Sequence, residues 1–216
     1  MKRLSFLLPC LVLAACAAPP AAEDGRLRVA ASIYPLAHFT RIVGGDAVTV
    51  TQLTPAGVEP HDYEPTAQDR IAAESSDLLV LNGGGIDAWV ERVATEREGP
   101  VLTVTDGMAL LPGAPHEGEE EEHDAHEDEA HDEELDPHVW LDPQRASTIV
   151  GVIRDSLAAA DPERAADYVR NAELFQRELA ALDKAFSEGL AECELRTIVV
   201  SHDAYGYLAR RYDIET

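Results

Sequence analysis

The sequence predicts an α/β protein with two parallel-sheet lobes bridged by a long α-helix, the second lobe being mostly missing from its 216 residues. In the first half, short apolar segments alternate with amphipathic ones. Strands that are apolar on both faces are typical of a parallel sheet covered by helices. Residues 163–192 then repeat apolar side chains at three- and four-residue spacing, which predicts one long helix. A further β-branched segment at 196–201 would open the second lobe, and we expect the chain to be a fragment.

The N-terminal residues predict an export signal rather than a part of the fold. Two basic residues precede an apolar run that ends at Ala15 and is too short to span a bilayer as a stable helix. The small residues before Cys16 resemble a bacterial lipoprotein signal, in which the cysteine is lipidated and becomes the new N-terminus. We therefore expect an exported protein, lipid-anchored to the bacterial membrane or periplasmic. Ordinary cleavage near residues 17–22 is the alternative.

The elements of the first half are delimited by proline, glycine and capping residues. We expect strands at residues 27–33, 47–53, 77–81 and 101–105, and helices at 35–42, 66–75 and 86–95. Thr66 and Asp69 have the spacing of a helix N-cap and its N3 residue. The triple glycine at 83–85 lacks the spacing of a phosphate-binding motif and a following lysine, which favours a plain turn.

The second half begins with a stiff turn at Asp136-Pro137-His138. Asp142 and Pro143 have the N-cap and N1 residue types that open a helix, expected at 145–160. Asp161-Pro162 is expected to cap the long helix. The resulting division is a signal peptide at 1–15, a tether at 16–26, an N-terminal α/β lobe at 27–160 with a disordered loop at 112–134, a linking helix at 161–192, and the start of a truncated lobe at 193–216.

The net charge of −24 is concentrated in one segment. Residues 117–136 contain thirteen Asp or Glu and no Lys or Arg, which leaves −11 for the rest of the chain. Such a segment cannot bury enough apolar surface to fold alone. The loop also carries His116, His123, His126 and His131, which suit weak capture of divalent metal. Nucleic acid is excluded as a partner, because phosphate affinity depends on basic side chains.

Four histidines lie outside the signal and the acidic loop. His61 and His202 each follow a predicted strand, and His138 lies on the turn before a helix. In open α/β sheets ligands bind outside the carboxyl ends of the strands. We therefore predict that His61, His138 and His202 converge on one divalent ion, with Zn–N distances of about 2.0–2.1 Å. His38 falls inside a predicted helix and is expected to be structural.

Three segments resemble signature motifs of one family, the bacterial metal-binding proteins that serve zinc or manganese ABC importers. The segments are Pro60-His61-Asp62-Tyr63-Glu64-Pro65, Asp136-Pro137-His138-Val139-Trp140-Leu141-Asp142-Pro143 and Ser201-His202-Asp203-Ala204-Tyr205-Gly206-Tyr207. The similarity runs in order from about Leu27 to the end. The histidine-rich insert is similar to that of the zinc-specific branch.

The resemblance implies that metal lies in a cleft between two lobes. His61 and His138 would come from the first lobe and His202 from the second. The fourth ligand of the family is usually a carboxylate late in the second lobe; Glu59 and Glu64 are alternative candidates. Cys193 is either a free thiol or, as the resemblance allows, the partner of a cysteine in the missing lobe.

The expected function is extracytoplasmic capture of Zn²⁺ by a monomer and its delivery to the membrane permease of an ABC importer. Alternatives are a manganese or iron importer component and a surface metal buffer or adhesin. A zinc hydrolase would use the same open three-histidine site. However, the sequence has no H-E-x-x-H motif, no partnered nucleophile and no evident general base, so we expect no enzymatic activity.

Overall fold

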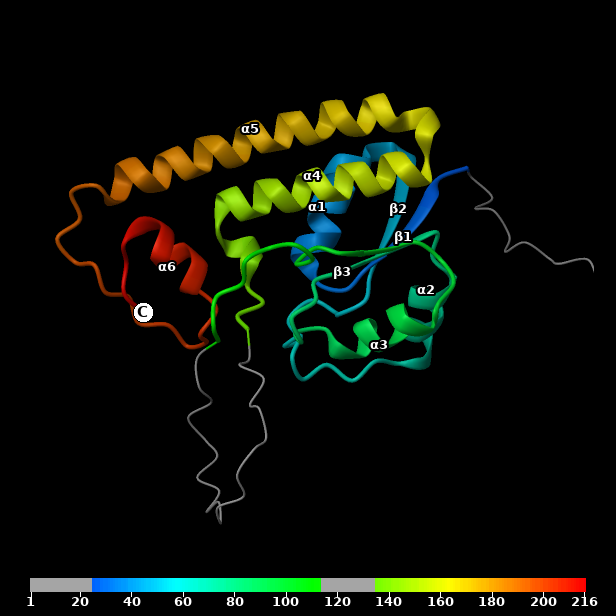
Figure 1. Ribbon diagram of the computed structural model, residues 1–216, viewed down its shortest axis with the longest axis horizontal. Helices are drawn as coiled ribbons and strands as arrows, with labels where there is room; N and C mark the ends of the chain where they lie inside the picture. Colours follow the sequence, from blue (N-terminus) through cyan, green and yellow to red (C-terminus); the bar gives the residue numbers. More distant parts are fainter. Residues whose placement is uncertain (1–24, 114–134) are drawn as a thin grey trace, which may run out of the picture.

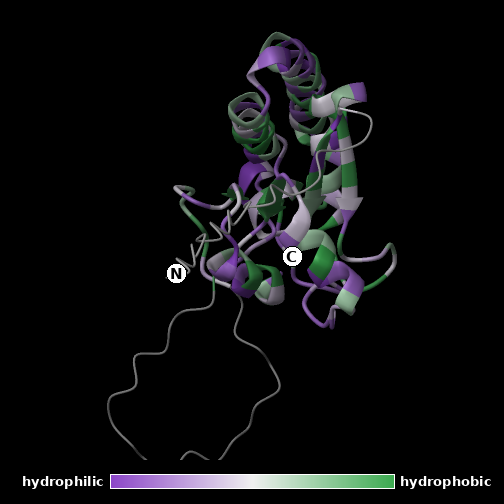
Figure 2. Cartoon of the chain, turned by 90° about the vertical axis from the view of Figure 1, so that its right-hand side faces the viewer, coloured by the Kyte–Doolittle hydropathy of each residue, from purple (hydrophilic) through white to green (hydrophobic). Residues whose placement is uncertain are grey.

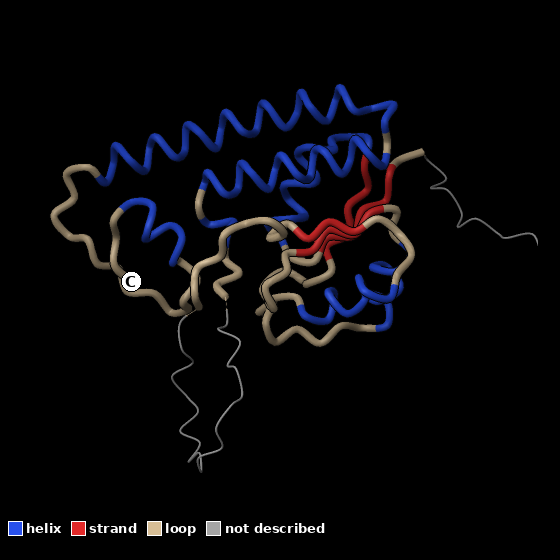
Figure 3. Tube along the Cα trace, in the orientation of Figure 1, coloured by secondary structure: helices blue, strands red, loops and turns tan. Residues whose placement is uncertain are grey.

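The computed structural model describes residues 25–113 and 135–216. One four-stranded parallel sheet forms its centre (Figure 3). The strands are β1 (Leu27–Ala31), β2 (Val48–Gln52), β3 (Leu78–Leu81) and β4 (Val101–Thr103), in the order β2-β1-β3-β4. All four residues of β3 are buried, as expected for a strand covered on both faces. The predicted α/β class is confirmed.

Helices cover both faces of the sheet (Figure 1). On one face lie α1 (Tyr34–Gly44), α4 (Pro143–Ala160) and α5 (Ala165–Leu190). On the other lie α2 (Ala67–Ser75) and α3 (Ala88–Glu96). Each expected helix of the first half is present with ends shifted by one to two residues. The Thr66–Asp69 capping box forms, and Asp142 caps α4 as predicted.

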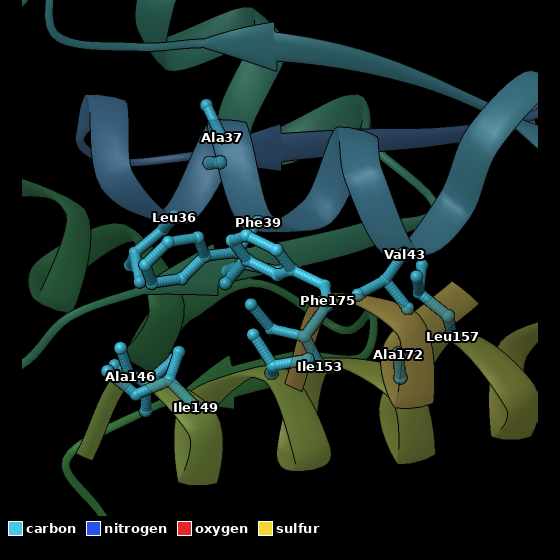
Figure 4. Packing of buried hydrophobic residues seen from close by; sticks show 14 of the residues in the cluster. Leu36, Ala37, Phe39, Val43, Ala146, Ile149, Ile153, Leu157, Ala172 and Phe175 are labelled. Atoms are coloured by element: carbon cyan, nitrogen blue, oxygen red, sulfur yellow. The ribbon is translucent and has the colours of Figure 1, made fainter. Parts of the chain in front are cut away.

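The larger part of the core lies between α1, α4, α5 and the sheet. Leu36 and Val43 of α1 pack with Ile153 of α4 and Phe175 of α5 (Figure 4). A smaller cluster around Trp89 lies on the opposite face, under α2 and α3. In Figure 2 both hydropathy colours alternate around the two long helices, as expected of helices with one buried face. The sheet is therefore packed against buried side chains on both of its faces.

Two details of the second half differ from expectation. The Asp161 carboxylate accepts no capping hydrogen bond from a backbone N–H group of the following turn. It accepts hydrogen bonds from the side chains of Arg164 and Tyr168 instead. A short 3₁₀ turn (Pro162–Arg164) precedes α5. The cause is the proximity of two side-chain donors, which compete with backbone N–H groups for the carboxylate.

The predicted strand at 196–201 is wrong. This segment forms a single bridge, between Thr197 and Glu215, and Val199 is 99% exposed. A strand is stabilised by a neighbour along its whole length, and the described residues offer this segment only the short stretch at Glu215. The short helix α6 (Gly206–Tyr212) follows. A second parallel sheet is not found within 25–113 and 135–216.

Several predictions concern residues outside the described ranges. They include the signal peptide, the lipidation site Cys16 and most of the tether. The four loop histidines, His116, His123, His126 and His131, lie there too. None of the helices in the described ranges has both the length and the apolar character needed to cross a bilayer.

Candidate metal centre

Three histidines that are far apart in the sequence meet at one point. Nε2 of His138 lies 3.4 Å from Nε2 of His61 and 3.1 Å from Nε2 of His202. One ring nitrogen from each of the three lies within 4.8 Å of the other two. His61 comes from the loop after β2, His138 from the turn before the 3₁₀ helix η2 (Val139–Leu141), and His202 from the segment before α6. The predicted convergence is therefore present.

The spacing of these nitrogens matches a shared tetrahedral ion. Two nitrogens each about 2.0–2.1 Å from Zn²⁺ at a tetrahedral angle lie about 3.3 Å apart. The distances of 3.4 and 3.1 Å bracket that value. When the Nε2 atoms are unprotonated, a cation shared by their lone pairs would make this arrangement favourable. The three rings leave a fourth position for another ligand.

His138 is the most rigidly held of the three. Its Nδ1 lies 2.8 Å from Oδ1 of Asp136, and its backbone N–H donates to the same oxygen at 2.9 Å. His138 is 5% exposed, whereas His61 and His202 are exposed. The carboxylate accepts a hydrogen bond from Nδ1–H, which leaves the Nε2 lone pair directed at the other histidines, the usual arrangement of a metal-binding imidazole.

The turn that carries His138 is tied to the end of β3. The buried Nδ2 of Asn82 donates to the carbonyl oxygen of Pro137 at 2.9 Å. Gly84 has a φ of 71°, and a Cβ there would lie 3.3 Å from Cβ of Pro137. The glycine segment is thus a turn, as predicted. It also lets the backbone approach the histidine-bearing turn closely.

Asp87 holds this glycine turn from within. Its carboxylate accepts the backbone N–H groups of Asn82 at 2.7 Å and Gly83 at 3.0 Å. Burial raises the pKa of the Asp87 carboxyl, although these hydrogen bonds oppose the rise. Desolvation of the charged form is the stronger influence. Asp87 therefore fixes Asn82, and Asn82 fixes the turn before His138.

The loop that carries His61 is anchored two residues later by Tyr63. The Tyr63 hydroxyl donates to Oδ2 of Asp69 in α2 at 2.7 Å, which raises the pKa of Tyr63. Its ring packs edge-on against Trp89 of α3, with centroids 6.3 Å apart. His61 is thereby attached to the helices on the second face of the sheet.

Other predicted site residues lie outside this cluster. His38 is in α1, stacked on Tyr34 with ring centroids 5.7 Å apart, and is not part of the triad. Glu59 and Glu64 are exposed, and the group of converging ligand atoms in the described ranges does not include them. Their assignment as a fourth ligand stays a prediction.

The sequence profile of the family described as "Zinc-uptake complex component A periplasmic" matches residues 29–216. The chain belongs to this family. The zinc-uptake component A family consists of binding proteins of transport systems. Membership therefore confirms the resemblance inferred from the three histidine motifs and the expectation that the chain is not an enzyme.

Individual metal-binding lipoproteins are also similar to this chain over its whole length. The zinc-binding lipoprotein AdcA of Streptococcus pneumoniae serotype 4 is 38% identical over 221 residues, which cover 100% of this chain and 43% of AdcA. The manganese-binding lipoprotein MntA of Halalkalibacterium halodurans is 33% identical, covering 100% of this chain and 70% of MntA. The chain thus spans less than half the length of AdcA.

The fold is shared with solved structures. The crystal structure of the Zn(II)-bound ZnuA-like domain of Streptococcus pneumoniae AdcA matches with a TM-score of 0.76 at 34% identity, over 88% of this chain and 66% of that chain. The part of the zinc-uptake fold present here is the helix-covered parallel sheet with its long helix.

Proposed function

We propose that this protein captures Zn²⁺ outside the cytoplasm and delivers it to the membrane permease of an ABC importer. The observation that carries the proposal is the approach of the Nε2 atoms of His61 and His202 to within 3.4 and 3.1 Å of Nε2 of His138. The ion is the cargo of this site and is bound reversibly. His61, His138 and His202 are the proposed ligands. The fourth position is filled by water or a carboxylate, with Glu59 and Glu64 as candidates.

Zinc is preferred over manganese because of the donor set. Three imidazole nitrogens suit zinc, whereas manganese favours carboxylate and other oxygen ligands. The AdcA relative is described as zinc-binding, and its ZnuA-like domain was crystallised with Zn(II). MntA, described as manganese-binding, is 33% identical. A carboxylate in the fourth position would shift the preference towards manganese, so that ligand decides the selectivity.

The proposed architecture places the site between two lobes. Residues 27–160 form the first lobe, the helix at 161–192 links it to a second, and residues 193–216 begin that second lobe. His202 would then approach His61 and His138 from the opposite side of a cleft. A lipid on Cys16 would hold the protein at the membrane, close to the permease. The acidic insert would raise the local cation concentration, mainly at low ionic strength.

The test uses the intact protein, purified without a histidine tag. We expect one tightly bound zinc per molecule by elemental analysis, in preference to manganese offered at equal concentration. Cells lacking the gene should lose zinc uptake at limiting zinc. A purified protein that retains manganese but not zinc would contradict the proposed cargo, and hydrolysis of esters or peptides above background would contradict a pure binding role.

A further inference from the structure

The segment that carries His202 has little support of its own. Ser201, His202 and Asp203 are exposed, and Val199 is 99% exposed. The first buried side chains after His202 are Ala204, at 7% exposure, and Tyr207, at 2%. Of these, Tyr207 is the first large side chain that attaches the segment to the rest of the molecule. Tyr207 is therefore the large buried anchor nearest to His202, while Asp183 holds the far end of α6 through Arg211 and Tyr212.

Tyr207 is attached through its hydroxyl to two backbone groups. The hydroxyl donates to the carbonyl oxygen of Asp136 at 2.6 Å and accepts the N–H of Leu111 at 2.9 Å. Leu111 and Asp136 are themselves paired, since the Asp136 N–H donates to the Leu111 carbonyl at 2.8 Å. The ring lies under the guanidinium of Arg145, 4.2 Å from the ring centroid, a favourable cation–π contact. Both the hydroxyl and the ring of Tyr207 therefore contact neighbouring groups.

The residue that receives this anchor is the one that orients His138. Oδ1 of Asp136 is the partner of the His138 imidazole, and its carbonyl is the partner of Tyr207. Gly206 approaches the same residue, because a Cβ there would lie 2.8 Å from Oδ2 of Asp136. One aspartate therefore contacts the imidazole of one proposed ligand and the chain segment that bears another.

We infer that Tyr207 is a positioning residue for zinc binding, which places His202 against His138 by bonding to the backbone of Asp136. This inference rests on the proposed function. Its physical basis is the entropy of an exposed segment. Without an anchor, His202 samples many positions, and the entropy lost when zinc orders it makes the free energy of zinc binding less favourable. Tyr207 and the close approach of Gly206 impose that order before the ion arrives.

The experiment compares zinc affinity in Tyr207→Phe and Tyr168→Phe variants of the intact protein by chelator competition. Tyr207→Phe keeps the ring and leaves the Leu111 N–H and the Asp136 carbonyl without their shared partner. We expect about a tenfold weaker zinc affinity. Tyr168 is the matched control: it is fully buried and donates to Asp161 at 2.9 Å, where the 3₁₀ turn at Pro162–Arg164 meets α5. Its phenylalanine variant should lose thermal stability but bind zinc as the parent does.

A double-mutant cycle separates positioning from a general structural role. In a His202→Ala background, Tyr207→Phe should change zinc affinity less than about twofold, because the ligand it positions is gone. An equal loss with and without His202 would overturn the inference, and so would unchanged affinity of Tyr207→Phe in the parent.

Gly206→Ala gives a second test that leaves the hydroxyl in place. Its methyl group would displace Asp136 or α6, so zinc affinity should fall here as well. Parental affinity in Gly206→Ala would likewise contradict the inference. Failure of the parent protein itself to bind zinc tightly would instead contradict the proposed function, so the two failures are distinguishable.

Discussion

Nδ1 of the His138 imidazole lies 2.8 Å from the Asp136 carboxylate, and both side chains are buried. The pair fixes the proton on Nδ1 and directs Nε2 at His61 and His202. An aspartate to asparagine change removes the acceptor charge. The neutral amide oxygen that takes its place is a weaker acceptor for Nδ1–H, because the backbone N–H of His138 keeps an oxygen at the Oδ1 position.

Asp136→Asn should therefore weaken zinc binding by about 10- to 100-fold, as is usual when the partner of a metal-binding histidine is lost. Chelator competition at constant pH measures the change. Asp161→Asn is the control, because the Asp161 carboxylate bonds the side chains of Arg164 and Tyr168, which lie outside the histidine cluster. Equal affinity of the Asp136→Asn variant and the parent would show that the carboxylate does not set the tautomer.

Asn82→Ala should weaken zinc binding several-fold by freeing the turn that bears His138. The change removes the 2.9 Å hydrogen bond to the Pro137 carbonyl, which keeps only the Val139 N–H at 2.8 Å, and such a hydrogen bond contributes about 0.5–1.5 kcal/mol. Asn171→Ala is the control, since Asn171 makes a comparable 3.0 Å bond to the Val43 carbonyl in α1. Both variants should unfold at lower denaturant concentration. If both also lost zinc affinity equally, the effect would be global and not a property of the turn.

Deleting residues 117–134 should leave the tight zinc site intact and remove only weak additional zinc equivalents. The ends of the insert are already paired, because Pro112 and Leu135 form an antiparallel bridge. The four residues left between them are enough for a hairpin loop. Calorimetric titration counts both classes of site. Loss of the tight equivalent on deletion would make the insert, rather than the histidine triad, the main receptor.

The docking of α6 on α5 should depend on pH through Asp183. Its carboxylate accepts Arg211 Nε at 2.6 Å and the Tyr212 hydroxyl at 2.8 Å, and the Arg211 bond lowers the pKa of Asp183 below its usual 3.8. A lowered pKa stabilises the fold above the unfolded-state value, and that stabilisation is lost as pH falls through the folded-state value. Asp183→Asn should therefore cost about 2 kcal/mol at pH 7 and progressively less below about pH 4.

Denaturant unfolding at pH 7 and pH 3 measures this difference. Asp155→Asn serves as the control, because Asp155 pairs with Arg154 at the exposed surface, where ion pairs contribute little. A stability gap between the Asp183→Asn variant and the parent that stayed constant from pH 7 to pH 3 would contradict the role of the ionised carboxylate.

The sequence predicted the elements whose signals are local. Apolar segments between turn residues gave the four strands to within two residues, and the Thr66–Asp69 and Asp142–Pro143 patterns gave helix starts. The convergence of the three histidines was also predictable, because each lies in a motif next to a strand or helix end. The strand expected at 196–201 was wrong because a strand depends on a neighbour that the segment itself does not specify.

Long-range supports of the site left little trace in the sequence. Asn82 and Tyr207 contact residues 55 and 71 positions away, and nothing in their immediate neighbourhood marks them as partners of the His138 turn. Asp87 falls at the start of the helix expected at 86–95, and the sequence gives no sign that its carboxylate accepts hydrogen bonds from the backbone of the preceding turn. Such contacts follow from the packing of the whole sheet, which composition and periodicity do not determine.

Binding of one ion by three imidazoles should depend most on His138, since its Nε2 approaches both other rings. The measurement is a calorimetric zinc titration of the intact, untagged protein and its His138→Ala variant, with His38→Ala as control. We expect one tight zinc equivalent in the parent and in His38→Ala, and none in His138→Ala. A tight equivalent that survives in His138→Ala would contradict the account.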